Sequence, residues 1–224
     1  IFKIMNFENL NILIATPCYN GQVYASYTES LINTVNLLNS LNIKYNIHFI
    51  KNQLVTRARN MLTYLFLKEE NNYSHMMFID ADVVWDPRSL LLLLEHNKEC
   101  VIGLYPNKSY DMNYNLKLSS QPKIPIEINN NLFEIKYAAT GFMLLNKKAF
   151  ERIKHEVDYF YLPNGTPDKK PVQIYNFFDC NVVNNNYLTE DYYFSHLFNK
   201  NGGKIYADSR IKLKHCGTHE YFQK

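Results

Sequence analysis

A glycine-rich phosphate-binding loop is missing from this sequence of 224 residues. Neither Gly-x-Gly-x-x-Gly nor Gly-x4-Gly-Lys-Ser/Thr occurs among its 7 glycines, although such loops bring backbone N–H groups to a nucleotide phosphate. A Rossmann dehydrogenase and a P-loop NTPase are therefore disfavoured. Phosphate binding by this chain would depend on a metal ion and on cationic side chains.

Paired cysteines and basic clusters are also missing. The 4 cysteines, Cys18, Cys100, Cys180 and Cys216, form no Cys-x-x-Cys pair, which argues against a zinc ribbon or a thioredoxin-type site and favours reduced, mostly buried thiols. The formal net charge is only +3, and the basic residues form no long run. We therefore expect no nucleic-acid partner.

Long apolar runs and a recognisable secretory signal are likewise lacking. No apolar stretch approaches the roughly 18 residues that span a bilayer, and residues 1–10 have no basic region, long apolar run or small-residue cleavage site. We expect no integral membrane segment and a cytoplasmic location, which would be the host cytoplasm if the protein is viral. The sequence does not indicate an oligomeric state.

The sequence does contain 46% hydrophobic residues, enough for the core of one sizeable domain. In the first half, apolar runs typical of strands alternate with segments of helical period, which predicts a mostly parallel sheet with helices on both faces. The expected strands are 11–16, 45–50, 75–80 and 100–105, and the expected helices are 26–41, 56–68 and one that starts near Asp86-Pro87. Leu31, Val35, Leu38 and Leu41 should face the core, and Thr56 should be an N-cap.

The second half predicts a smaller antiparallel portion. Segments 132–139 and 142–145 can pair as strands about Thr140-Gly141. The remaining expected elements are helices at 147–154 and 190–199, short strands at 204–207 and 211–214, a long excursion at 107–131 and a loop at 163–171. The predicted fold class is α/β, a single Rossmann-like domain over residues 1–224.

The triplet Asp80-Ala81-Asp82 follows a buried apolar strand and precedes a helix start. In an open α/β sheet this position lies at the carboxyl-end crevice where ligands bind. Two carboxylates there suit Mn²⁺ or Mg²⁺, which would share its coordination shell with a diphosphate and stabilise the charge of the leaving group. A solvated acidic loop is the alternative interpretation.

The segment Val55-Thr-Arg-Ala-Arg-Asn60 places two arginines at a helix start. A cation gains nothing from the helix dipole at that end, so Arg57 or Arg59 is expected to face an anionic ligand or a carboxylate. The alternative is an exposed helix face.

Two further motifs have both structural and functional interpretations. Thr189-Glu190-Asp191 starts the last predicted helix, where acids are stabilised by the dipole, but one carboxylate can also act as a general base. His215 and His219 are four residues apart, yet Gly217 between them argues against a helical zinc pair. His215 becomes a site candidate only if the fold returns it to Asp82.

Taken together, these segments resemble an A-type (GT-A) family of glycosyltransferases found in phages, large DNA viruses and bacteria, related to the cellulose synthase-like family. The resemblance extends over nearly the whole chain. Its motifs are Ala15-Thr-Pro-Cys-Tyr-Asn20, Val55-Thr-Arg-Ala-Arg-Asn60, Phe78-Ile-Asp-Ala-Asp82, Gly103-Leu-Tyr-Pro-Asn-Lys108, Ala139-Thr-Gly-Phe-Met-Leu144, Phe177-Phe-Asp-Cys180, Leu188-Thr-Glu-Asp191 and Lys214-His-Cys-Gly-Thr218.

The resemblance implies a nucleotide-sugar-binding half at about 11–106 and an acceptor-binding, catalytic half at about 132–224. Asp82 would bind the metal ion directly, His215 would complete the metal site, and Asp80 would lie at the metal or nearer the ribose. The other implied donor and acceptor contacts are Thr16, Pro17, Tyr19, Arg57, Lys108, Thr140, Gly141, Phe178 and Asp179.

The implied reaction is inverting transfer of one sugar from a nucleoside diphosphate sugar, UDP-sugar by default, to a hydroxyl of a glycan or protein. Asp191 would be the base and Glu190 a sugar or acceptor contact, although the two can exchange roles. The chain has no Gln-x-x-Arg-Trp motif, which argues against long-polymer synthesis. The alternatives are a sugar-phosphate nucleotidyltransferase and a non-catalytic glycan- or nucleotide-binding module.

Overall fold

The computed structural model describes residues 8–106, 108, 116–118, 126–129, 131–163, 170–217 and 221–222. Most of the excursion at 107–131, the middle of the loop at 163–171 and His219 lie outside these ranges. None of the helices in the described ranges is both long and apolar enough to cross a membrane.

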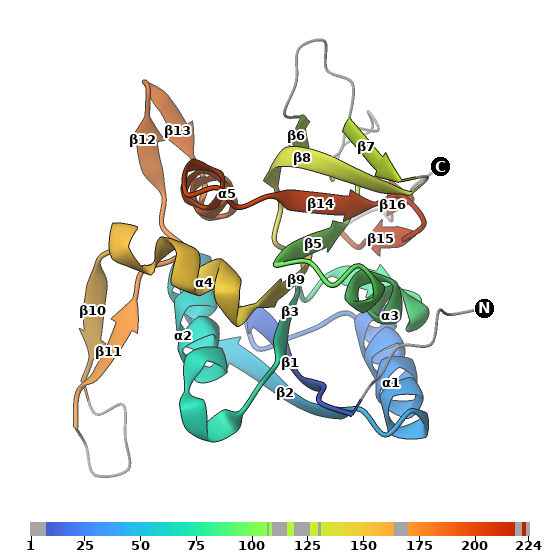
Figure 1. The fold of residues 1–224 in the computed structure, drawn as a ribbon. Helices are drawn as coiled ribbons and strands as arrows, with labels where there is room; N and C mark the ends of the chain where they lie inside the picture. The colour runs from blue at the N-terminus through green and yellow to red at the C-terminus, as the bar shows by residue number, and fades with distance from the viewer. Residues whose placement is uncertain are drawn as a thin grey trace.

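A mixed sheet forms the centre of the molecule (Figure 1). Its strand order in the described chain is β2 (Lys44–Lys51), β1 (Asn11–Cys18), β3 (His75–Ile79), β9 (Phe142–Asn146), β5 (Cys100–Gly103), β14 (Ile205–Asp208), β8 (Leu132–Ala138) and β6 (Leu116–Leu118), with β7 (Ile126–Asn129) also on β8. Strands β2, β1, β3, β5 and β14 run in one direction, whereas β9 and β8 run against them. The predicted α/β class with a mostly parallel sheet is confirmed.

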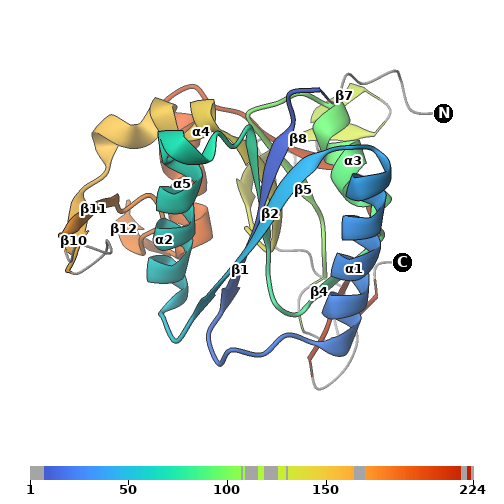
Figure 2. The ribbon, with the colours of Figure 1, turned by 90° about the horizontal axis from the view of Figure 1, so that it is seen from below.

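Helices cover both faces of this sheet, as Figure 2 shows. One face carries α1 (Ala25–Ser40) and α3 (Arg88–Glu95), and the other carries α2 (Val55–Leu67), α4 (Lys147–Ile153) and α5 (Glu190–Lys200). Two short 3-10 turns, η1 (Glu69–Asn71) and η2 (Lys154–Glu156), follow α2 and α4. Alternate residues of β1 serve the two layers: Leu13 faces the α2 side and Ile14 the α1 side, as the two-residue period of a strand requires.

Within the part of the chain that the structure describes, three small antiparallel sheets accompany the central one. β10 (Tyr159–Leu162) pairs with β11 (Val172–Tyr175), and β12 (Asn181–Val183) pairs with β13 (Asn186–Leu188). β4 (Val83–Trp85) pairs with β15 (Leu213–His215), which also pairs with β16 (Tyr221–Phe222). β4 was not among the predicted strands, and it brings the C-terminal segment back to the Asp80-Ala81-Asp82 turn.

The predicted hairpin of 132–139 with 142–145 is wrong. β9 lies between β3 and β5, whereas β8 pairs with β14, β6 and β7. Residues 142–145 of β9 are buried on both faces, and a strand that is apolar on both faces belongs at the centre of a sheet. The short link 139–141 therefore crosses to another part of the sheet instead of closing a hairpin.

One detail of the predicted helices is incomplete and another is wrong. Leu38 of α1 is buried, and Leu31 and Leu41 pack against the same core, as predicted, but the buried residues of α1 also include Tyr27, Ser30 and Thr34. The Trp85 backbone N–H donates to Ser30 Oγ at 3.2 Å, and its indole N–H donates to Thr34 Oγ1 at 2.8 Å. Helix α2 starts at Val55, and Leu54, rather than Thr56, takes the N-cap position.

Candidate active site

A cavity of about 710 Å³ opens at the carboxyl end of β1, next to the Asp80-Ala81-Asp82 turn. Ligand sites in open α/β sheets form at this edge. Its lining residues are Pro17, Tyr19, Asn20, Gln22, Val23, Tyr24, Gln53, Leu54, Val55, Asp80, Ala81 and Asp82. Pro17 and Tyr19 thus line a cavity, and their contact with a nucleotide stays a prediction.

Thr16 and Arg57 do not line this cavity. Thr16 is fully buried, and its hydroxyl is 2.6 Å from that of Tyr27. Arg57 is exposed on the first turn of α2. Arg59 faces the acidic residues instead, because side chains two positions apart on a helix point to different sides.

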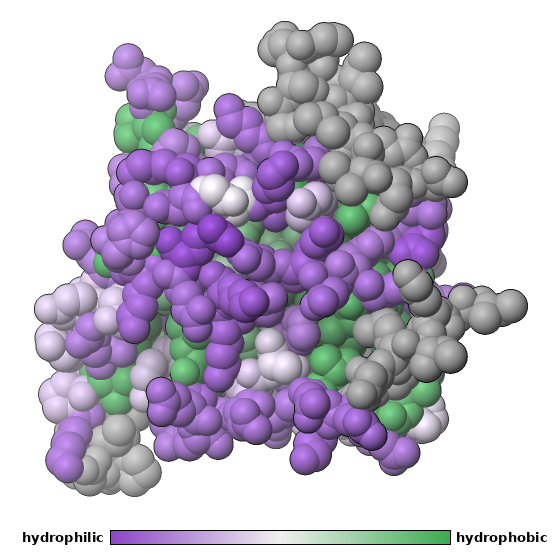
Figure 3. All heavy atoms as spheres, in the orientation of Figure 1, coloured by the Kyte–Doolittle hydropathy of each residue, from purple (hydrophilic) through white to green (hydrophobic). Residues whose placement is uncertain are grey.

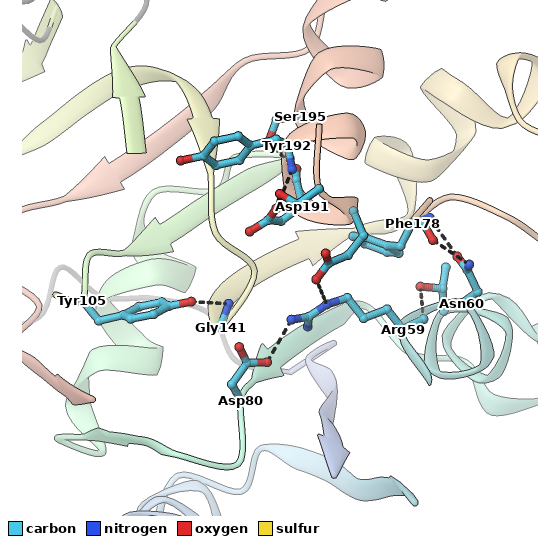
Figure 4. A network of polar contacts seen from close by, with 12 residues as sticks. Arg59, Asn60, Asp80, Tyr105, Gly141, Phe178, Asp191, Tyr192 and Ser195 are labelled. Carbon is cyan, nitrogen blue, oxygen red and sulfur yellow. Dashed lines mark hydrogen bonds and ion pairs between the residues drawn. The ribbon is translucent and has the colours of Figure 1, made fainter. Parts of the chain in front are cut away.

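Arg59 connects two acidic segments of the chain (Figure 4). Its Nη2 is 3.0 Å from Asp80 Oδ1, and its Nε is 3.5 Å from Glu190 Oε1. The side chain is only 4% exposed. Burial lowers the pKa of Arg59, but the carboxylates of Asp80, Glu190 and Asp191 outweigh burial and leave that pKa above its ordinary value. Arg59 was one of two arginines expected to face an anion or a carboxylate, but the resemblance implied Arg57 at the site.

Gly141 is held against Asp80 by the backbone. The Asp80 N–H donates to the Gly141 carbonyl at 3.0 Å, and the Gly141 N–H donates to the Tyr105 hydroxyl at 3.1 Å. A Cβ at Gly141 would lie 2.3 Å from the Tyr105 oxygen and 2.7 Å from Asp80 Oδ2. Only glycine permits this approach. The neighbouring Thr140 is buried as well, and the backbone contact with the acidic turn is made by Gly141.

Asp82 has a different set of partners. The Lys108 ammonium donates to Asp82 Oδ2, and His215 Nε2 lies 3.4 Å from the same oxygen. Burial raises the pKa of Asp82, but the hydrogen bonds from His215 and Lys108 outweigh it and hold that pKa below its usual range. The fold thus returns His215 to Asp82, through the β4–β15 pairing.

The orientation of His215 suits a divalent cation. Its Nδ1 is 3.0 Å from the Pro106 carbonyl, and because a carbonyl only accepts, Nδ1 carries the proton. Nε2 then faces a carboxylate oxygen, an arrangement that needs either a second ring proton or a cation between the two atoms. Metal-bound histidines commonly donate their other ring N–H to a carbonyl in this way.

The predicted trio of metal ligands is not gathered together. Within the ranges that the structure describes, no three side chains of the types His, Cys, Asp and Glu form a group that could hold a metal ion. Asp82 and His215 form a pair, whereas Asp80 Oδ1 contacts Arg59. Asp80 therefore belongs to the Arg59 network, and a bound ion would need diphosphate oxygens and water to complete its coordination.

Glu190 and Asp191 are the first two residues of α5. In Figure 4, Asp191 lies above the Arg59 guanidinium and Asp80 lies below it. Burial raises the pKa of Asp191, and the adjacent Glu190 carboxylate raises it further, against the hydrogen bonds from the Thr189 hydroxyl and the Tyr192 N–H. Thr189 is the N-cap by position, but its hydroxyl donates to Asp191 instead of capping the helix backbone. The Asp191 carboxyl is therefore easier to protonate than an ordinary aspartate.

Asn60 fixes the segment that carries Asp179. Its amide donates to the Phe178 carbonyl at 3.0 Å and accepts from the Phe178 N–H at 2.9 Å. Asp179 in turn accepts from Asn176 Nδ2 and from the Cys180 N–H, each at 2.8 Å. The contact of Asn60 with the Phe178 backbone was not predicted, although Asn60 directly follows Arg59 in the segment 55–60.

No protein-family model matches this chain, and a search of curated proteins gives no match. Among solved structures, the crystal structure of A197 from STIV has a TM-score of 0.56 and 20% sequence identity, covering 96% of this chain and 95% of that chain. The similarity to A197 shows a shared fold.

Two other solved structures match less well. A glycosyltransferase involved in the glycosylation of the major capsid of PBCV-1 has a TM-score of 0.33 and 12% identity, covering 62% of each chain. The 4-diphosphocytidyl-2C-methyl-D-erythritol synthase from Anaerococcus prevotii DSM 20548 has a TM-score of 0.36 and 10% identity, covering 65% of this chain and 75% of that chain.

Proposed function

We propose that this protein is an inverting glycosyltransferase that transfers a sugar from a nucleoside diphosphate sugar to a hydroxyl of an acceptor. The observation that supports this most directly is the link through Arg59, which joins a cavity-lining aspartate, Asp80, to the acids at the start of α5. A donor bound in the cavity would thus lie on one side of Arg59 and a proton acceptor on the other.

The cavity suits the nucleotide part of the donor. Pro17, Tyr19 and Val55 give it apolar walls, and Asp80 to Asp82 form its acidic border. Nucleotide sites typically combine apolar walls with a few placed polar groups. We assign the base and ribose to this cavity, with UDP as the default nucleotide, and the diphosphate to the border at Asp82.

Asp82 and His215 would hold a Mn²⁺ or Mg²⁺ ion, since a carboxylate oxygen and an imidazole nitrogen face each other there. Such an ion would stabilise the negative charge of the departing diphosphate. Lys108, which contacts the same carboxylate, would supply a second positive charge to the diphosphate.

Asp191 would be the general base. The acceptor oxygen forms a bond to the anomeric carbon as the bond from that carbon to the diphosphate oxygen breaks, and the bonding pair leaves with the diphosphate. The acceptor proton passes to the Asp191 carboxylate, whose raised pKa favours accepting it. Glu190, which pairs with Arg59, would hold the base in position.

A two-part experiment tests this function. Thermal shift with UDP, GDP and their sugar conjugates, with and without Mn²⁺, should show metal-dependent stabilisation by at least one of them. Donor hydrolysis should then be measurable for that compound. No stabilisation by any donor would contradict the proposal, and binding without turnover would favour a non-catalytic module.

A further inference from the structure

A pair of apolar side chains lies exposed on the hairpin that leads into α5. Val182 of β12 and Tyr187 of β13 are direct cross-strand partners, so their side chains lie on the same face of the hairpin. They are 62% and 67% exposed. Figure 3 shows a small apolar area on this projecting hairpin, within a mostly hydrophilic face of the molecule.

The hairpin is built to hold this pair in place. Its turn residues Asn184 and Asn185 both have positive φ, 49° and 61°, which is the geometry of a tight two-residue hairpin turn and one that asparagine tolerates. Leu188, next to Tyr187, is buried and anchors β13 to the body. The Tyr187 ring thus extends from a short and closely defined strand pair.

The same hairpin leads directly into the acids of the candidate site. Tyr187 precedes Glu190, the first residue of α5, by three positions. The Cys180 thiol and the carboxylates of Glu190 and Asp179 raise the pKa of the Tyr187 hydroxyl. The residues that line the donor cavity all come from positions 17–24, 53–55 and 80–82, so the hairpin is a separate surface that reaches the acids from another side.

The size and chemistry of this surface select its ligand. A protein partner typically buries about 800 Å² per side, whereas one tyrosine presents at most about 150–250 Å². A saccharide ring matches one aromatic ring in size, with apolar C–H faces that pack on it and hydroxyls at its edge. Asp179, whose two oxygens accept one hydrogen bond each, has acceptor capacity left for such hydroxyls.

We propose that Tyr187, supported by Val182, is the stacking platform for a saccharide acceptor that presents a hydroxyl to Asp191. This inference rests on the proposed function and narrows it, because it selects a glycan over a polypeptide as the acceptor. Tyr187 is a binding residue that contributes contact area, and Asp179 sets the orientation of the bound ring.

The test measures binding of methyl glycosides of glucose, galactose, mannose and rhamnose, and of a serine- and threonine-containing peptide, by saturation-transfer NMR with UDP and Mn²⁺ present. At least one methyl glycoside should bind the wild type. Tyr187→Ala should weaken that binding about tenfold or more, because the ring contact is lost. Tyr187→Phe should stay within about threefold, since the ring remains.

Tyr161→Ala is the matched control, because Tyr161 is 60% exposed on the neighbouring β10–β11 hairpin. It should bind the same glycoside as tightly as the wild type, and all variants should bind UDP equally. Unchanged glycoside binding by Tyr187→Ala, or binding of the peptide alone, would overturn the platform. Failure of the wild type to bind UDP would instead count against the proposed function. The difference in glycoside binding between the wild type and Tyr187→Ala would still show whether Tyr187 binds a saccharide.

Discussion

Asp80 and Asp82 are two residues apart in one turn, yet their surroundings differ in kind. Asp80 contacts the buried guanidinium of Arg59, whereas Asp82 contacts Lys108, whose side chain is 38% exposed, and the imidazole of His215. A buried pair that loses one member leaves an uncompensated charge, but a partly exposed lysine can exchange its place with another cation. We infer that the Asp80 side is structural and the Asp82 side is the one that takes up ligands.

Replacing Arg59 removes the cation that pairs with both Asp80 and Glu190. Arg59→Leu leaves Asp80 and Glu190 without their shared partner, and we expect the free energy of unfolding to fall by about 3–5 kcal/mol. Urea denaturation followed by circular dichroism measures this loss. Arg57→Leu, on the exposed side of the same helix, should change the value by no more than about 0.5 kcal/mol, and equal effects would remove the distinction between the two arginines.

Replacing Asp191 tests the acid that lies beyond Arg59. Asp191→Asn should lower sugar transfer by about 10²–10⁴-fold and leave donor binding unchanged, because Asp191 does not line the donor cavity. A single-turnover assay with saturating donor measures the loss. If Glu190→Gln lost as much transfer while Asp191→Asn lost little, the two acids would have the opposite roles.

The raised pKa of Asp191 sets the pH dependence. Transfer should rise with pH through this raised pKa, since only the ionised carboxylate accepts a proton. Its favourable contribution to stability runs the other way: it is present below the ordinary pKa of an aspartate and is lost as pH rises through the raised value. Asp191→Asn should therefore stabilise the fold at neutral pH, by about 0.5–2 kcal/mol, and not below the ordinary pKa. Thermal melts of the wild type and Asp191→Asn, at neutral pH and at a pH below the ordinary pKa of an aspartate, measure this difference.

Replacing Asp80 and Asp82 separately distinguishes their effects on stability from their effects on UDP binding. Asp82→Asn should weaken Mn²⁺-dependent UDP binding at least about tenfold and change stability by no more than about 1 kcal/mol. Asp80→Asn should show the larger loss of stability, because Arg59 then keeps one carboxylate fewer. Isothermal titration and urea denaturation on both variants give the two values, and a reversed pattern would refute the assignment.

Replacing Lys108 should give the smallest change in affinity, but the changes for Mn²⁺ and for UDP should have opposite directions. Because Lys108 and the proposed metal ion would compete for Asp82, Lys108→Gln should bind Mn²⁺ alone up to about fivefold tighter, corresponding to an exposed ion pair of about 0.2–1 kcal/mol. The same variant should bind UDP more weakly, since a cation for the diphosphate is lost. Electron paramagnetic resonance measures the metal, with Lys148→Gln as an exposed control in α4. Weaker metal binding by Lys108→Gln would contradict the competition.

The apolar runs predicted the layers of the fold better than they predicted its connections. Strands at 11–16, 45–50, 75–80 and 100–105 are present within two residues. β1, β3 and β5 are buried parallel strands, which are continuous apolar runs, whereas β2 is the end strand of the sheet and alternates in exposure. β9 is also a continuous apolar run, but its place between β3 and β5 depends on long-range pairing that no local pattern records. Strand β4 has only three residues and was missed for lack of length.

The sequence predicted the place of a site residue where a strand end fixes the direction of its side chain. It did not predict which of two similar residues in one motif faces the site. Asp80 and Asp82 follow a strand end, so their place at the cavity follows from the strand. Arg57 and Arg59 share one motif, and the choice between them depends on the helix start, which lies at Val55. Asn60 and Tyr105 act by bonding to distant backbone, at Phe178 and Gly141, which the sequence does not reveal.

The central place of β9 has a consequence for how the chain folds during synthesis. β3 and β5 are both finished within the first 103 residues, but the strand that joins them ends at residue 146. Until β9 arrives, each has an unpaired apolar edge of the kind that promotes aggregation. The first half should therefore not reach a protected state alone, and a ribosome-bound chain should become resistant to protease only after β9 has left the exit tunnel.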